Sequence, residues 1–133
     1  MGATLCNHLP TPWHDPIISE TIATTLLAQP HHVLLLAGDA HVLARLTPEA
    51  PADILTLYTP PHARRQGLAR QLMVDVIARV RTAGCTGITL EVRASNVPAI
   101  TLYTSLGFTR ANLRRGYYHE PQEDGVVYTL KLD

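Results

Sequence analysis

The 133-residue sequence predicts a single α+β (mixed α/β) domain over residues 1–133, with helices and strands interleaved along the chain. Apolar residues recur at three- and four-residue steps over residues 67–83, which is typical of an amphipathic helix. From Ile88 to Arg93 they alternate with polar residues, which is typical of a strand with two different faces. No internal repeat and no low-complexity linker divides the chain.

The first half of the chain predicts one short helix and three strands. Its prolines disfavour regular structure in residues 1–16. A polar–apolar pattern that starts at Ser19 and stops at Pro30 predicts the helix. Gly38-Asp39 lies between two apolar runs, which is typical of a hairpin turn. Strands are expected over residues 32–37, 42–46 and 54–59.

The second half alternates helix and strand. The amphipathic helix over residues 67–83 is expected to end at Gly84, since glycine suits the position after a helix. After the strand of alternating residues, Ser95-Asn96 offers a cap for a second helix, which leads to Gly107. Residues 126–132 predict the last strand, and the pattern leaves room for a further one.

Composition favours a cytoplasmic protein. With 46% hydrophobic residues and equal numbers of acidic and basic side chains, the chain is not of the disordered class. The longest strongly apolar run, residues 33–37, is too short to span a membrane, and the absence of Lys or Arg before Arg45 argues against a signal peptide. Cys6 and Cys85 match no metal or redox spacing, so free thiols are expected.

Positive charge is concentrated in one part of the neutral chain. Residues 62–115 contain nine arginines but only two acidic residues. This asymmetry favours a local anionic ligand, although surface helices that simply carry arginine would give the same count. No RNA-binding motif with interleaved aromatic residues is present, so nucleic acid is not an expected partner. The seven histidines match no zinc spacing, and no metal is expected.

The segment Arg64–Ala69 lies between a predicted strand and the start of the amphipathic helix. The first N–H groups of a helix lack partners and attract phosphate. Gly67 lets a phosphate approach the backbone, and Arg64, Arg65 and Arg70 can add charge. No P-loop and no GxGxxG motif is present, and by itself the segment fits an ordinary polar helix start equally well.

This segment resembles the Gln/Arg-x-x-Gly-x-Gly/Ala signature of the Gcn5-related N-acetyltransferases. Residues 90–96 (LEVRASN), 105–108 (SLGF) and 114–118 (RRGYY) are similar to the branch that acetylates the N-terminal alanine of bacterial ribosomal proteins. The resemblance implies a central, mixed, mostly antiparallel sheet flanked by helices, here with a shortened N-terminal region. It also implies that residues 114–118 help to shape the acceptor site.

The resemblance further implies acetyl-CoA as co-substrate and assigns residues to it. Backbone amides of residues 65–70 would hold the pyrophosphate, the strand at 57–59 would pair with the pantetheine arm, and Asn96 would bind the arm from its other side. Glu91 would be the general base and Tyr103 the general acid. The implied cofactor-binding residues are Leu57, Tyr58, Thr59, Arg64, Arg65, Gln66, Gly67, Leu68, Ala69, Arg70 and Asn96.

These roles agree with the chemistry of acetyl transfer. A protonated amine must lose its proton before it attacks a thioester, and a carboxylate can remove that proton. The departing thiolate is stabilised by a phenol donor, and the thioester oxygen by a backbone N–H of residues 57–59. Simpler interpretations remain: Glu91 as a surface partner of Arg93 or Arg79, Tyr103 as a core aromatic residue and Asn96 as a helix cap.

Two features depart from the family's pattern. The Pro-rich residues 1–16 replace a longer N-terminal region that helps to form the acceptor cleft. Tyr58 stands where a small residue is usual, so it either narrows the site or points to the other face of the sheet.

The acidic residues Glu120, Glu123 and Asp124 either attract a basic substrate or belong to a solvated loop.

The resemblance implies direct transfer of acetyl, in a ternary complex, to a protein N-terminal α-amine, in particular that of a ribosomal protein. Within the same chemistry, the alternative acceptor is a small-molecule amine or a lysine side chain. A different class is a catalytically silent acyl-CoA-binding module whose shortened N-terminal region closes the acceptor cleft.

Overall fold

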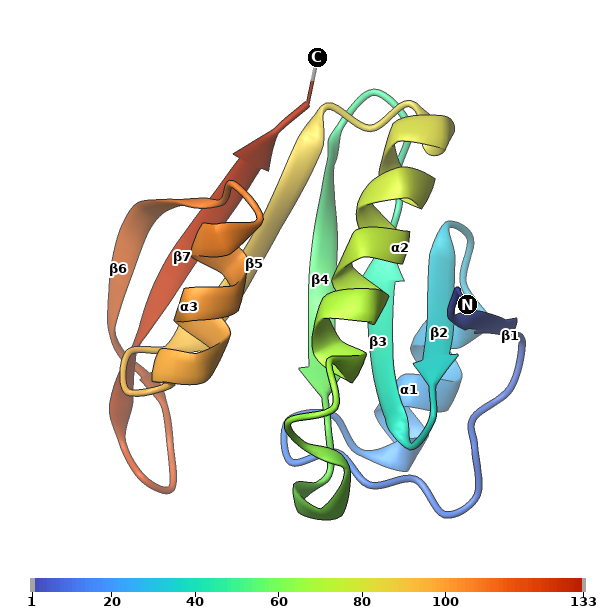
Figure 1. The fold of residues 1–133 in the computed structure, drawn as a ribbon, viewed down its shortest axis with the longest axis horizontal. Helices are drawn as coiled ribbons and strands as arrows, with labels where there is room; N and C mark the ends of the chain where they lie inside the picture. The colour runs from blue at the N-terminus through green and yellow to red at the C-terminus, as the bar shows by residue number, and fades with distance from the viewer. Residues whose placement is uncertain (1, 133) are drawn as a thin grey trace.

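A computed structural model describes residues 2–132, which form one seven-stranded sheet with helices on both faces (Figure 1). The strand order is β1-β2-β3-β4-β5-β7-β6, and all neighbouring pairs are antiparallel except β4 and β5. The mixed, mostly antiparallel sheet expected for this chain is therefore confirmed. The elements are β1 (Thr4–Cys6), α1 (Glu20–Leu27), β2 (His32–Ala37), β3 (Ala40–Arg45), β4 (Pro51–Tyr58), the 3₁₀ helix η1 (Pro61–Ala63), α2 (Leu68–Ala83), β5 (Gly87–Arg93), α3 (Val97–Ser105), β6 (Thr109–Tyr118) and β7 (Glu123–Lys131).

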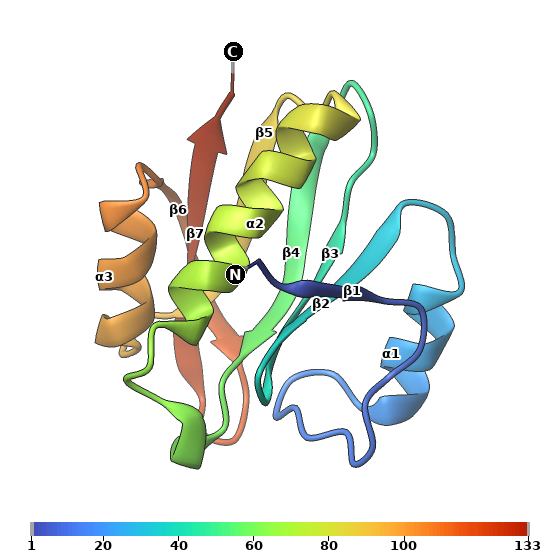
Figure 2. The ribbon, with the colours of Figure 1, turned by 45° about the vertical axis from the view of Figure 1, so that its right-hand side comes forward.

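Two apolar layers hold the helices to the sheet. Because side chains alternate along a strand, Leu34 and Leu43 point to one face and pack with α1, whereas Leu35 and Val42 point to the other and pack with α2. Helices α2 and α3 lie together on this second face, as Figures 1 and 2 show. The sheet thus has one face covered by two helices and another covered by α1 and the chain that leads into it.

The parallel pair β4 and β5 is joined along only part of its length. Pairing runs from Pro51–Asp53 to Gly87–Thr89, and beyond these residues the two strands diverge (Figure 1). β4 also carries a bulge, because Leu43 pairs with Thr56 but Ala44 pairs with Ile54, which leaves Leu55 as an extra residue. The second half of β4 therefore presents an edge without a strand partner toward β5.

Most predicted elements are confirmed. Ser19 caps α1, Gly84 follows α2 with φ 79°, and Asn96 caps α3, as the sequence predicts. The predicted hairpin joins β2 and β3. β4 begins at Pro51 rather than at residue 54, because its first residues pair with β5.

One expectation about the ends of the chain is wrong and one is completed by the structure. Residues 1–16 contain the strand β1, which pairs with the edge of β2 and is preceded by Ala3, whose N–H donates to Asp75 of α2 (3.0 Å). The C-terminal part contains, in addition to β7, the strand β6, for which the sequence pattern left room without giving its bounds. β6 has no fully buried residue and lacks apolar alternation, since its pairing with β7 rather than burial holds it.

Both cysteines, Cys6 and Cys85, are free, as predicted. Among residues 2–132, none of the helices has the length and apolar character needed to cross a membrane.

Candidate functional site

A cavity of about 1060 Å³ occupies the space between the diverging halves of β4 and β5. Its lining comes from β4, the loop before α2, β5, α3, the end of β6 and the loop before α1. Ten of the eleven predicted cofactor-binding residues line it, together with Glu91 and Tyr103. Gln66 is exposed and lies outside the lining. The structure thus brings together residues that are far apart in the sequence.

The N-terminus of α2 opens into this cavity without a side-chain cap. Its N-cap residue is Gly67 at φ 75°, which makes no side-chain cap, whereas Ser19 and Asn96 cap the other two helices. Arg65, just before it, also has a positive φ of 64°. Uncapped N–H groups and the positive end of the helix dipole favour an anion at this position.

Two arginines make hydrogen bonds around the start of α2. Arg64 Nε donates to the carbonyl oxygen of Thr59 (3.0 Å), which holds the loop at the end of β4. Arg70 Nη2 donates to Ser105 Oγ (2.6 Å), which joins α2 to α3. Both guanidinium groups therefore have a structural role, and they add positive charge around the helix N-terminus.

Glu91 lies on β5, on the face opposite the apolar residues Ile88, Leu90 and Val92. Its side chain is 27% exposed, and Oε1 lies 3.4 Å from Arg114 Nη1 of β6. The hydrogen bond of the Tyr117 hydroxyl to Glu91, together with burial, raises the pKa of that phenol. Glu91 thus faces the cavity with partners from the last hairpin.

Glu91 does have an arginine partner, as the simpler interpretation expects, but the partner is Arg114 and not Arg93 or Arg79. Arg79 pairs with Asp75 (2.8 Å), one turn earlier on α2. Arg93 pairs with Glu123 (3.4 Å) and its guanidinium lies over the ring of Tyr118 (4.6 Å to the centroid).

Tyr103 is both a core residue and a cavity residue. Its side chain, only 6% exposed, packs against Phe108 with ring centroids 5.7 Å apart. Burial raises its pKa well above the usual value, so the phenol keeps its proton at neutral pH. It can therefore donate a hydrogen bond into the cavity but cannot act as a base there.

Asn96 has the helix-capping role that its position suggests. Its Oδ1 accepts from the N–H of Ala99 (3.2 Å), and the residue also lines the cavity. Since the cap uses only the oxygen, the two N–H donors of the side-chain amide can serve a ligand.

Two interpretations of Tyr58 were left open: that it narrows the site, and that it points to the other face of the sheet. The structure agrees with both. It pairs with His41 across β3 and β4, and the two rings lie 5.8 Å apart, so it points to the face covered by the loop before α1. It also lines the cavity. Tyr58 therefore closes the cavity on that face.

The acidic residues of the last hairpin are largely engaged within the chain. Glu123 accepts from the N–H of Ser95, and Asp124 accepts from the N–H of Gly116 (2.8 Å). Glu123 thus ties the hairpin to the residues after β5, Asp124 ties β7 to β6, and only Glu120 lies in an exposed turn.

Sequence reasoning missed the wall formed by the loop before α1. Pro16 and Ile17 line the cavity beside Thr56 of β4. No local pattern marks them, because their placement depends on a buried aspartate, Asp15, that contacts β3 and β4.

Among residues 2–132, no group of three or more His, Cys, Asp or Glu side chains is arranged to hold a metal ion.

Comparison with known proteins points to one family. The model of the acetyltransferase (GNAT) family matches residues 8–108. The [ribosomal protein bS18]-alanine N-acetyltransferase of Salmonella typhimurium is 38% identical over 104 residues, covering 74% of this chain and 70% of that protein. The protein of the same name from Escherichia coli K12 is 40% identical over 83 residues, but the alignment covers only 56% of its length. The crystal structure of the E. coli ribosomal-protein-S18-alanine N-acetyltransferase superposes with a TM-score of 0.78 at 27% identity, covering 98% of this chain and 94% of that one.

Proposed function

This chain belongs to the acetyltransferase (GNAT) family, and from this premise we propose that it transfers the acetyl group of acetyl-CoA to the N-terminal α-amine of a ribosomal protein. The observation that carries the proposal is the cavity between β4 and β5. It joins an uncapped helix N-terminus, an unpaired strand edge, a carboxylate and a buried phenol in one continuous space.

The groups that line the cavity define the orientation in which acetyl-CoA binds, from its pyrophosphate at α2 to its thioester near Glu91. The pyrophosphate binds the N–H groups at the start of α2, beside Arg64 and Arg65. The pantetheine arm, which carries amide groups, runs along the free edge of β4 at Leu57–Thr59 as an additional strand would. The amide of Asn96 meets the arm from the side of α3. The thioester then lies between the ends of β4 and β5, near Glu91 and Tyr103.

The chemistry requires two proton transfers. Glu91 takes a proton from the α-ammonium group, directly or through a water molecule, and the free amine attacks the thioester carbonyl. A backbone N–H of β4 stabilises the negative oxygen. As the carbon–sulfur bond breaks, Tyr103 donates its proton to the leaving thiolate. No covalent enzyme intermediate and no metal take part in this scheme.

The ribosomal acceptor is inferred from relatives whose names specify it. Glu91 points to the face of the sheet on which the loop before α1 and Tyr58 lie, so the acceptor is expected to approach from this face, opposite α2 and α3. The proposal places the protein in the cytoplasm, where ribosomal proteins are synthesised.

Gly67→Ala is expected to raise the KM for acetyl-CoA roughly ten-fold, since the left-handed backbone at φ 75° costs an alanine about 1–2 kcal/mol and distorts the loop that binds pyrophosphate. Gly84→Ala is the matched control, because Gly84 caps the other end of α2 at φ 79° and also has open space around it. It should lower the melting temperature without changing this KM. Equal KM values for the two variants would contradict the assignment of the loop.

The function is tested by following thiol release from acetyl-CoA in the presence of peptides that begin with Ala, Ser, Met or Gly and a panel of small amines. We expect turnover with one class of peptide and little with small amines. Turnover with small amines alone would retain acetyl transfer and exclude the protein acceptor. Binding of acetyl-CoA without any turnover would identify a silent acyl-CoA-binding module.

A further inference from the structure

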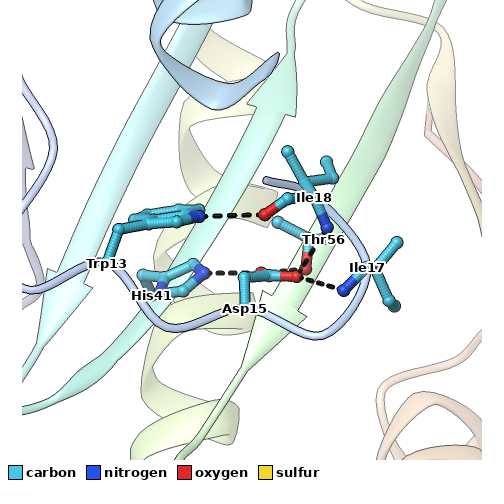
Figure 3. Close-up of polar contacts among 6 residues, drawn as sticks. All are labelled: Trp13, Asp15, Ile17, Ile18, His41 and Thr56. Carbon is cyan, nitrogen blue, oxygen red and sulfur yellow. Dashed lines mark hydrogen bonds and ion pairs between the residues drawn. The ribbon is translucent and has the colours of Figure 1, made fainter. Parts of the chain in front are cut away.

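Asp15 is a buried carboxylate at the centre of a network that joins the loop before α1 to the sheet (Figure 3). Its side chain is 0% exposed. One oxygen, Oδ2, accepts from Thr56 Oγ1 (2.6 Å) and lies 2.8 Å from His41 Nε2. The other, Oδ1, accepts from the backbone N–H groups of Ile17 (2.7 Å) and Ile18 (2.9 Å). A single side chain thus connects β3, β4 and the loop.

The aromatic ring of Trp13 packs against this network. The ring of Trp13 stacks on that of His41 with centroids 4.2 Å apart, and its Nε1 donates to the carbonyl oxygen of Ile18 (2.9 Å). Figure 3 shows Trp13 against the face of the imidazole and Asp15 at its Nε2 edge, so both residues tie the loop to His41.

Asp15 is held in its charged form. Burial alone raises the pKa of a carboxyl group, but the hydrogen bonds from His41, Thr56, Ile18 and Ile17 outweigh it and lower the pKa of Asp15 below its usual value. A buried carboxylate that lost these donors would be costly, so the loop, His41 and Thr56 are constrained to stay together.

The residues fixed by this network form one wall of the cavity. Pro16 and Ile17 follow Asp15 directly, Thr56 donates to it, and Tyr58 lies against His41. Ile17 leaves its apolar side chain 60% exposed, although its N–H is bound. An exposed isoleucine on a fixed backbone is suited to contact the first residues of an acceptor chain.

We propose that Asp15 and His41 are positioning residues, which hold the Pro16–Ile17 segment and Tyr58 as the acceptor-side wall of the cavity. This inference rests on the proposed function and adds to it the residues that govern acceptor affinity. Neither residue contacts the reacting atoms, because both lie behind the lining. Their loss is therefore expected to weaken acceptor binding and to leave acetyl-CoA binding intact.

The chain offers matched variants for this test. His41→Leu removes the ring nitrogen beside Asp15, whereas His41→Gln can return an N–H donor to the same oxygen. Thr56→Val removes the other side-chain donor at nearly constant volume and is milder, in case His41→Leu does not fold. His62→Leu is the control, since His62 and Asp39 also lie 2.8 Å apart but are 68% and 71% exposed and outside the cavity lining.

The first readout is steady-state kinetics with a peptide acceptor. For His41→Leu and Thr56→Val we expect the KM for the peptide to rise roughly ten-fold or more, with the KM for acetyl-CoA unchanged and kcat reduced less than the peptide KM is raised. His41→Gln should restore the wild-type KM, and His62→Leu should match wild type. An unchanged peptide KM in both His41→Leu and Thr56→Val overturns the inference, as does an equal rise in both KM values.

The second readout does not need turnover. Trp13 is the only tryptophan of the chain, so its fluorescence reports directly on the wall. Release of the loop in His41→Leu should shift Trp13 emission to longer wavelength and speed the exchange of the Ile17 and Ile18 amide protons. If wild type acetylates no peptide, the proposed function fails by itself, and unchanged emission and exchange in His41→Leu would then overturn the positioning role.

Discussion

Glu91→Gln is expected to reduce acetyl transfer by roughly 10²–10⁴-fold at neutral pH, the usual range for a general base, without changing the affinity for acetyl-CoA. Glutamine retains the shape of the side chain and can still accept from Tyr117, but it cannot take a proton from the acceptor amine. The loss therefore measures proton removal rather than the arrangement of the last hairpin. Isothermal titration with acetyl-CoA and initial rates of thiol release separate the two quantities.

The pH dependence of this loss tests the role of Glu91 more strictly. An α-amine has a pKa of about 7.7–8.0, so it is mostly protonated at pH 6.5 and mostly neutral at about pH 9.5. The defect of Glu91→Gln should accordingly be largest at low pH and shrink as the pH rises through the pKa of the amine. Glu20→Gln, an exposed substitution at the start of α1, is the matched control and should behave as wild type. A defect of constant size across this range would assign Glu91 a role in binding or structure instead.

Tyr103→Phe is expected to lower kcat by roughly 10²–10⁴-fold while the KM values for both substrates stay within a small factor. The ring remains to pack against Phe108, so the core is preserved, and only the proton donor for the leaving thiolate is lost. Because burial raises the pKa of Tyr103, the phenol is protonated throughout the neutral range. The ratio of the two kcat values should therefore be the same at pH 6.5 and at pH 8.5.

A second buried tyrosine provides the control for this substitution. Tyr128 of β7 is 8% exposed and lies outside the cavity lining, so Tyr128→Phe should leave kcat unchanged. Wild-type activity of Tyr103→Phe would contradict the assignment and would direct attention to Tyr118. That residue also lines the cavity, and burial together with the nearby Glu91 raises its pKa to about 12.

Local patterns were sufficient to predict the elements that carry their own signals. The apolar period of residues 68–83, the cap at Asn96 and the alternation at Ile88–Val92 each depend on neighbours in the sequence, and each was found where expected. The expectation that the loop at Gly67 binds phosphate likewise came from its place before a helix, and it stays a prediction. β1 was not predicted, and β6 was allowed for without bounds, because pairing with another strand, rather than a local apolar pattern, forms both.

The site was predictable to the extent that family motifs mark it. Glu91, Tyr103 and the residues before α2 belong to motifs, and the structure brings all of them except Gln66 to one cavity. The wall at Pro16–Ile17 was not predictable, since it depends on contacts of Asp15 with residues 26 and 41 positions away in the sequence. Such long-range polar contacts leave no periodicity in the chain.

The central claim is that this cavity directs acetyl transfer to a protein N-terminus. The most direct measurement is tandem mass spectrometry of a peptide that begins with alanine and contains one internal lysine, after incubation with the protein and acetyl-CoA. We expect a single acetyl group on the α-nitrogen of the alanine and none on the lysine side chain. Acetylation of the lysine, or an unmodified peptide while acetyl-CoA is bound, would contradict the account.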